Sequence, residues 1–333
     1  MKKISLCILA LFAMIVTCRG QAPEKVTFAR GAGQCVYAAY EPLKDKPITL
    51  YYYIPTRGDI ALMPVLFAMH GTKRHGNDAR DAWHELAERY GFIVLSPEYS
   101  KKLFSTNEYN YGNVSKSTTE FTPQPHALWT YNTIETIFDF FRDATGNLSD
   151  KYDIWGHSAG GQFVQRFLLC MPEARVNRAV AANAGTWTFL ATDGVRDRDG
   201  KVYGWPFSIK ETPFAEKENL KKFFARNFFV NIGTADINTT TSDFPNYPAA
   251  MAQGATRYAR GENFYKNALE EAKMLKCRIN WQKSEVRECG HSSKMMIYGK
   301  YEMQNGKKVY HTDYFTHTGA FWLIYGDRVL DKK

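Results

Sequence analysis

The stretch that decides the fold is YDIWGHSAGGQFVQRFLL, residues 152–169. Its centre, Gly156 to Gly160, has the pattern G-x-S-x-G, in which a serine sits on a sharp turn between a strand and a helix. Residues 152–155 read as a short strand, and 161–169 have apolar residues at helical spacing. The small flanking residues allow strand and helix to approach closely. The pattern predicts Ser158 as an exposed nucleophile, and an ordinary glycine-rich turn is the alternative.

The rest of the chain alternates strand and helix patterns, which favours a mostly parallel sheet. We therefore predict an α/β fold with helices on both faces of a central sheet and loop insertions around the active site, formed by residues 21–333 as one domain. The expected strands are 48–54, 64–69, 92–95, 178–184, 227–232 and 278–286, and the expected helices are 78–90, 126–142, 263–275 and 312–325.

Three long irregular segments interrupt this alternation: 101–124, 186–226 and 239–254. Long loops in a compact domain are usually functional. Each follows the end of an expected strand, and α/β sheets bind their ligands at that edge. We expect all three to form walls of a substrate site.

A serine hydroxyl needs a base to take its proton and an acid to orient that base. Enzymes with a serine on such a turn supply the acid and then the histidine later in the chain. Asp236 follows the buried strand pattern FVNIG, with Asp243 as its competitor, and His291 follows the last expected strand. The order predicts Ser158, Asp236 and His291 as the catalytic set.

The tetrahedral intermediate of acyl transfer carries a negative oxygen that needs two backbone N–H donors. Ala159, the residue after the nucleophile, is expected to supply one. The second is expected from Thr72, because His70-Gly71 ends a buried strand and Gly71 lets the following loop come close to the serine.

These residues together resemble the secreted serine esterases of the α/β-hydrolase superfamily. The resemblance rests on FAMHG at 67–71, WGHSAGG at 155–161, Asp236 and His291, and it covers about 48–325. Within the superfamily the chain is similar to the polyhydroxybutyrate-depolymerase-like and carbohydrate-esterase groups, and also to the α/β-hydrolase pectin methylesterases. The resemblance implies that no metal and no cofactor takes part.

Four residues are candidates for substrate contact. Trp187 and Trp205 could stack on sugar rings, or they could pack beneath the loops. Lys73 and Arg74 follow the oxyanion loop and could meet a substrate carboxylate, or they could face solvent.

Residues 1–20 read as an export signal: two lysines precede an apolar run from Ile4 to Val16, and small residues follow. Lipidation of Cys18 is the alternative, so the protein is expected to be periplasmic or secreted, or anchored by lipid at the cell surface. No later segment is long and apolar enough to span a membrane. Loss of residues 1–20 would leave four cysteines, which could form disulfides or stay free.

Loss of this segment would also lower the formal net charge from +9 to +6. This modest excess suits an anionic partner such as an acidic polysaccharide. The chain has no nucleic-acid motif or dense basic run, so no nucleic-acid partner is expected.

The leading functional hypothesis is hydrolysis of a methyl, acetyl or feruloyl ester on a carbohydrate polymer or oligosaccharide, with a slight preference for pectin. A lipase or a peptidase of the same fold is the alternative within enzymes. A binding protein that has the fold without catalysis is the alternative from another class.

Overall fold

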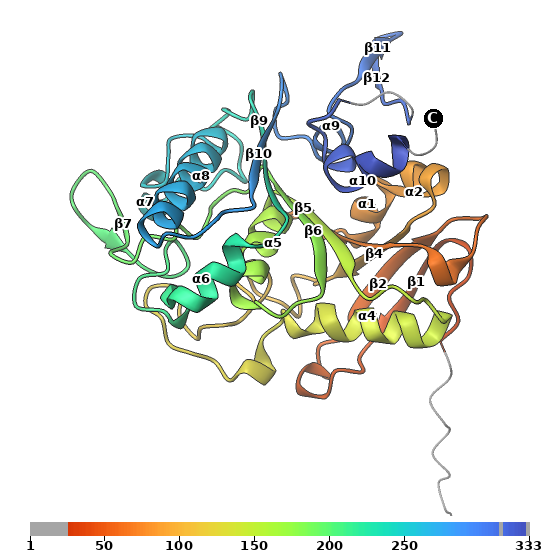
Figure 1. Ribbon diagram of the computed structural model, residues 1–333, viewed down its shortest axis with the longest axis horizontal. Coiled ribbons are helices and arrows are strands. Elements are labelled where there is room, and N and C mark those ends of the chain that lie inside the picture. The colour runs from red at the N-terminus through yellow and green to blue at the C-terminus, as the bar shows by residue number, and fades with distance from the viewer. Residues whose placement is uncertain (1–25, 313–315, 331–333) are drawn as a thin grey trace, which may run out of the picture.

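A computed structural model describes residues 26–312 and 316–330. The expected export signal at residues 1–20 and the alternative lipidation at Cys18 lie outside this range. An eight-stranded sheet crosses the molecule in the order β1-β2-β4-β3-β5-β6-β9-β10 (Figure 1). Its strands are β1 Gly31–Tyr37, β2 Ile48–Ile54, β3 Val65–Met69, β4 Ile93–Glu98, β5 Tyr152–His157, β6 Val176–Ala182, β9 Phe228–Gly233 and β10 Gln282–Val286.

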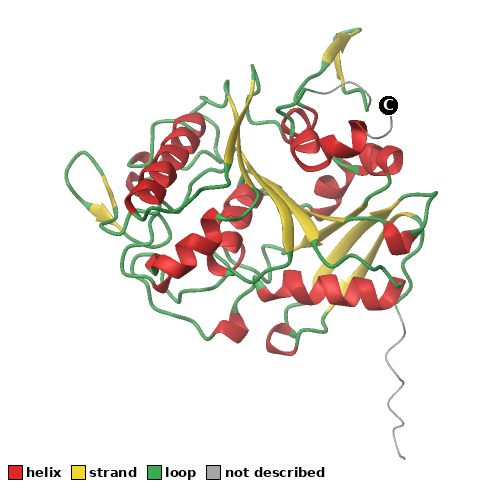
Figure 2. Ribbon diagram, viewed as in Figure 1, coloured by secondary structure: helices red, strands yellow, loops and turns green. Residues whose placement is uncertain are grey.

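Neighbouring strands from β4 to β10 run parallel, whereas β1 and β2 form an antiparallel edge. Helices lie on both faces of this sheet (Figure 2). The prediction of a mostly parallel α/β sheet is therefore confirmed. Two short hairpins project from the molecule: β7 Val195–Arg196 with β8 Val202–Tyr203, and β11 Glu302–Gln304 with β12 Lys307–Val309.

The helices are α1 Gly76–Asp81, α2 His84–Tyr90, α3 Thr106–Asn110, α4 Asn132–Thr145, α5 Ala159–Cys170, α6 Lys217–Phe224, α7 Pro248–Met251, α8 Arg257–Met274, α9 Ser293–Tyr298 and α10 Ala320–Leu330. One hydrophobic cluster joins one face of the sheet to α4, α5, α6 and α8. A second joins the other face to α1, α2, α9 and α10 (Figure 1). Along β3, Val65 and Phe67 enter the first cluster and Leu66 enters the second, as strand alternation requires.

Several expected boundaries are wrong. The helix expected at 78–90 is broken into α1 and α2 at Trp83, whose fully buried ring packs edge-on against Trp155. The helix expected from 126 is divided into a short 3-10 helix at His126–Leu128 and α4, which begins at Asn132; between them, Thr130 donates its backbone N–H to the carbonyl of Gly112 in a distant loop. Tertiary contacts thus override the local helical pattern at both places.

Other elements differ in length or were not expected. Strand β10 begins at 282 instead of 278, α8 begins at 257 instead of 263, and α10 begins at 320 instead of 312. The edge strand β1 and helix α6 lie in stretches for which the sequence predicted neither a strand nor a helix.

Close backbone contact fixes the turn at the centre of the sheet. A Cβ on Gly156 would lie 2.2 Å from the carbonyl oxygen of Gly160, and a Cβ on Gly160 would lie 2.2 Å from that of Met69 in β3. Ser158 between them has φ 59° and ψ −117°, a region that residues with side chains rarely occupy. The glycines therefore allow β5 and α5 to approach closely enough to hold Ser158 in this strained conformation.

We expect Gly160→Ala to lower the free energy of unfolding by about 3 kcal/mol, because the added methyl group meets backbone atoms of β3 that cannot move separately. The measurement is the midpoint of urea unfolding. Gly204→Ala is the matched control, since the nearest atom to its Cβ would be 3.6 Å away. Equal midpoints for the two variants would contradict the proposed backbone contact.

Candidate active site

Ser158 lies on the turn between β5 and α5, at the carboxyl end of the central strand. Its backbone N–H donates to the carbonyl of Ala182 at 2.9 Å, and its carbonyl accepts from the N–H of Gln162 at 3.1 Å. These bonds fix the backbone to β6 on one side and to α5 on the other. The side chain is partly exposed, so its hydroxyl remains accessible.

The structure brings the predicted acid and base together. Nδ1 of His291 lies 2.7 Å from Oδ2 of Asp236, whose side chain is only 1% exposed. Within the described residues, Nε2 of His291 has no hydrogen-bond partner. Because Nδ1 faces the carboxylate, Nε2 is the nitrogen left to accept a proton, and His291 and Ser158 line the same cavity.

Asp243, the competing acid, has a different partner. Its Oδ1 lies 3.2 Å from Nη2 of Arg257. Burial raises the pKa of Asp243, but a hydrogen bond from Thr241 and the charge of Arg257 outweigh it, so the pKa lies below its usual value. The geometry thus favours Asp236 over Asp243 as the residue that orients His291.

A second histidine lies directly beside the first. The ring centroids of His157 and His291 are 4.5 Å apart, and Nδ1 of His157 lies 3.0 Å from Oγ of Ser293. Burial lowers the pKa of His157 well below its usual value, and the nearby His291 lowers it further. His157 therefore stays neutral and adds no positive charge beside the base.

The loop after β3 is held by His70. Its Nε2 accepts the backbone N–H of Tyr99 at 3.0 Å, and its ring stacks on Tyr109 at 4.3 Å. Burial lowers the pKa of His70 to about 3, so the ring is neutral and can accept this bond. The hydroxyl of Tyr109 donates to the carbonyl of His70 at 2.6 Å. These contacts give the loop a fixed position relative to Ser158.

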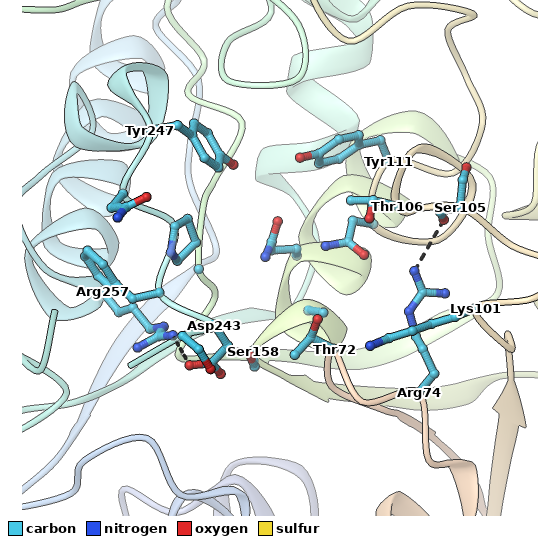
Figure 3. Close-up of a pocket in the computed structure, with 18 of the residues that line it drawn as sticks. Thr72, Arg74, Lys101, Ser105, Thr106, Tyr111, Ser158, Asp243, Tyr247 and Arg257 are labelled. Atoms are coloured by element: carbon cyan, nitrogen blue, oxygen red, sulfur yellow. Dashed lines mark hydrogen bonds and ion pairs between the residues drawn. The ribbon is translucent and has the colours of Figure 1, made fainter. Parts of the chain in front are cut away.

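The two expected oxyanion residues lie beside the nucleophile. Thr72, Ser158 and Ala159 all line one cavity (Figure 3). A Cβ on Gly71 would lie 3.9 Å from Cβ of Ser158, so the loop passes close to the serine. The roles of the Thr72 and Ala159 N–H groups stay predictions.

Two cavities, of about 470 and 810 Å³, meet at the nucleophile. The smaller one extends from Ser158 to Tyr111 and Tyr247, which lie at its far end in Figure 3. The larger one extends between α1 and the region around His291 and Ser293. The residues that line both are Thr72, Lys101, Ser158, Ser242 and Asp243.

Two of the four predicted substrate contacts are wrong, because Trp187 and Trp205 are fully buried and offer no ring face to a ligand. Trp187 stacks on Phe264 of α8 at 4.6 Å, and Trp205 packs against Phe214 at 5.4 Å. The expectation that 186–226 forms a wall of the site is also wrong, since no residue of this segment lines either cavity.

Lys73 is exposed and lines the larger cavity, whereas Arg74 is largely buried and lines the smaller one. Its guanidinium donates to the carbonyls of Tyr99, Phe104 and Ser105 at 2.8 to 3.4 Å, so it links two loops. Lys101, Tyr111, Tyr247 and Arg257 line the site and were not predicted. Lys101 could have been found, because it follows β4 closely, as Lys73 follows β3.

In the described part of the chain, no three His, Cys, Asp or Glu side chains are arranged to hold a metal ion. Cys35, Cys170, Cys277 and Cys289 are all free thiols. Among residues 26–312 and 316–330, no helix has the length and apolar character needed to cross a membrane.

Comparison with known proteins finds matches only among solved structures. No protein-family model matches the sequence, and no curated protein matches it either. The chain is similar to poly(aspartic acid) hydrolase-1 from Sphingomonas sp. KT-1, with 34% identity, a TM-score of 0.72, and coverage of 80% of this chain and 96% of the other. It is also similar to a poly(3-hydroxybutyrate) depolymerase from Bordetella parapertussis, with 28% identity, a TM-score of 0.71, and coverage of 80% and 88%.

We expect Asp236→Asn to lower kcat on a small activated ester by about 10⁴-fold, because the amide cannot hold the same His291 tautomer. Asp243→Asn should lower kcat by less than about tenfold, since Asp243 bonds to Arg257 and not to His291. Steady-state kinetics of the two purified variants is the measurement. If the larger loss occurs in Asp243→Asn, the acid is misassigned.

Proposed function

This chain belongs to the serine hydrolases of the α/β-hydrolase fold, and from that premise we propose that it hydrolyses carboxylic esters within an anionic polymer or oligomer. The main support is the arrangement of three residues. Ser158, which has a strained backbone, lines the same cavity as His291, and Nδ1 of His291 bonds to the buried Asp236. An esterified acidic polysaccharide such as pectin is the substrate type that we favour.

The geometry supports acyl transfer in two steps. Oγ of Ser158 attacks the ester carbonyl carbon while Nε2 of His291 takes the hydroxyl proton, and the charge on the carbonyl oxygen is met by the N–H groups of Thr72 and Ala159. His291 then gives the proton to the departing alcohol. Water attacks the acyl-enzyme by the same route and restores Ser158.

The placement of Ser158 supports a long substrate. Because two cavities meet at the nucleophile, the acyl part and the alcohol part of a substrate could lie in different cavities, and in a methyl ester of pectin the polymer is the acyl part. The group that leaves must lie near His291, and therefore towards the larger cavity. The acyl side would then extend into the smaller cavity towards Tyr111 and Tyr247.

The charge of the site supports an anionic substrate. Lys73 and Lys101 are exposed beside Ser158, and neither has an ion-pair partner among the described residues. In the same cavity, Asp78 is paired with His75 and Asp243 with Arg257. The two exposed lysines therefore add positive charge beside the nucleophile, which would attract a carboxylate-bearing chain.

An amide of an acidic polymer is the second candidate. The 34% identical structure is that of a poly(aspartic acid) hydrolase, and the same groups can protonate a departing amine.

We also propose that the protein is exported, on the basis of the signal-like pattern in residues 1–20.

We expect Ser158→Ala to abolish turnover and to lose the adduct that a fluorophosphonate probe forms with the parent protein. The parent is then assayed on a panel of methyl, acetyl and feruloyl polysaccharide esters, poly(3-hydroxybutyrate) and poly(aspartic acid), with each product measured separately. Turnover by Ser158→Ala would refute the serine mechanism. Turnover of neutral poly(3-hydroxybutyrate) alone would refute the anionic substrate.

We expect the double variant Lys73→Gln/Lys101→Gln to lower kcat/KM for an anionic polymer by about tenfold at low salt, because charged site walls concentrate an oppositely charged substrate. The loss should shrink at high ionic strength and should be absent with a neutral activated ester. The control is Lys151→Gln. Lys151 is exposed and precedes β5, so it lies at the opposite end of this strand from Ser158. Equal losses on neutral and anionic substrates would contradict the charge argument.

A further inference from the structure

Arg257 joins the acid of the catalytic set to the loop that lines the substrate site. Its side chain is 1% exposed and lies between two carboxylates. Nη1 is 3.7 Å from Oδ1 of Asp236. Nη2 is 3.2 Å from Oδ1 of Asp243, a contact drawn in Figure 3. One buried cation thus contacts both aspartates that compete, in the sequence, for the role of catalytic acid.

The backbone around Arg257 fixes its position. Thr256 caps α8, its side chain accepting from the N–H of Ala259, so Arg257 occupies the first helical position. The N–H of Tyr258 donates to the carbonyl of Asp236 at 3.2 Å, which ties the start of the helix to the acid's own backbone. The guanidinium lies over the ring of Phe244 at 5.2 Å, and that of Arg260 lies 4.6 Å from the same ring. Arg257 is therefore held by both the helix and the 239–254 loop.

The charge balance at Asp236 depends on this contact. Oδ2 of Asp236 faces His291, while Oδ1 has no hydrogen-bond partner among the described residues and faces only the Arg257 cation. A buried carboxylate is costly unless it is paired. Arg257 in turn shares its charge with Asp243, which lines both cavities.

We propose that Arg257 is a positioning residue for the catalytic acid, and that its pairing with Asp243 sets how readily His291 takes up a proton. The inference rests on the serine hydrolase mechanism but not on any particular natural substrate. Asp243 belongs to the substrate-lining loop, so the 239–254 loop and the catalytic base are electrostatically coupled through one side chain.

The charges around His291 define the expected signs. Its ring faces Asp236 after β9, Asp243 in the loop, and His157 at the end of β5, which stays neutral. Loss of the Arg257 cation leaves two carboxylates uncompensated and favours the imidazolium. Loss of the Asp243 charge does the reverse. The other charged or titratable groups that line the same cavity are His70, which stays neutral, Lys73, His75, Asp78 and Lys101, and Cys289 lies in the chain before the ring with Lys308 nearby.

The test is the pH dependence of kcat/KM on a small activated ester. Arg257→Gln should move the acid limb upward by about one pH unit and lower kcat by roughly tenfold to a hundredfold. Asp243→Asn should move the limb downward by about half a unit. Arg257→Lys keeps the positive charge, so the acid limb of its pH profile should lie close to that of the parent protein.

Controls separate this effect from misfolding. Lys266→Gln makes the same charge change on an exposed position of α8 and should leave the profile unchanged. Titration with a fluorophosphonate counts the active sites of every variant, and a parent enzyme that forms no adduct would refute the mechanism itself. With labelled sites present, an unmoved acid limb in Arg257→Gln overturns the proposal. Shifts of Arg257→Gln and Asp243→Asn in the same direction overturn it as well, and Asp243→Asn decides the case if Arg257→Gln does not fold.

Discussion

The close contact between β5 and α5 is the constraint on which the rest of the site depends. Gly156 and Gly160 allow backbone to meet backbone, and Gly160 also touches the carbonyl of Met69 in β3. Three central elements are thus fixed relative to one another at the residue that carries the nucleophile. The loops that bring Thr72, Asp236 and His291 follow β3, β9 and β10, so each starts from a position that this sheet defines.

Buried guanidinium groups give the irregular loops their shape. Arg74 bonds to carbonyls of the loop after β4, and Arg260 donates to the carbonyls of Gly185, Pro245 and Gly254 at 2.8 to 2.9 Å. Arg166 similarly holds Thr186, Thr188 and Pro206. Carbonyl groups in buried loops need donors, and an arginine can satisfy several of them at once. Buried arginines therefore hold these irregular segments in place, both beside the site and away from it.

The sequence allowed prediction of what depends on local pattern and chain order. The strands around Phe67 and Ile154 and the glycines of the turn follow from local sequence patterns, and the assignment of Ser158, Asp236 and His291 follows from their order in the chain. The burial of Trp187 and Trp205 could not be predicted from local pattern, because aromatic residues in a loop can either line a binding surface or pack in the interior. Only the position of Phe264, far along the chain, decides between them for Trp187.

The role of Arg257 was equally hidden, since nothing in RYARGEN distinguishes a buried arginine from a solvated one. Its burial arises from the approach of Asp236 and Asp243 to the start of α8. The same holds for Arg74, which the sequence presents as part of a basic cluster with Lys73. Contacts with distant parts of the chain bury Arg74, whereas Lys73 stays exposed.

The four free thiols mean that the described part of this fold holds together without oxidative cross-links. Burial raises the pKa of Cys35 to about 11 and that of Cys289 to about 12, and it raises the pKa of Cys170 well above its usual value. These three thiols therefore carry very little thiolate at neutral pH, and the thiolate is the nucleophile that reacts with oxidants and attacks disulfides. The packing of the described part of the fold therefore depends on buried side chains and not on cross-links between these four cysteines.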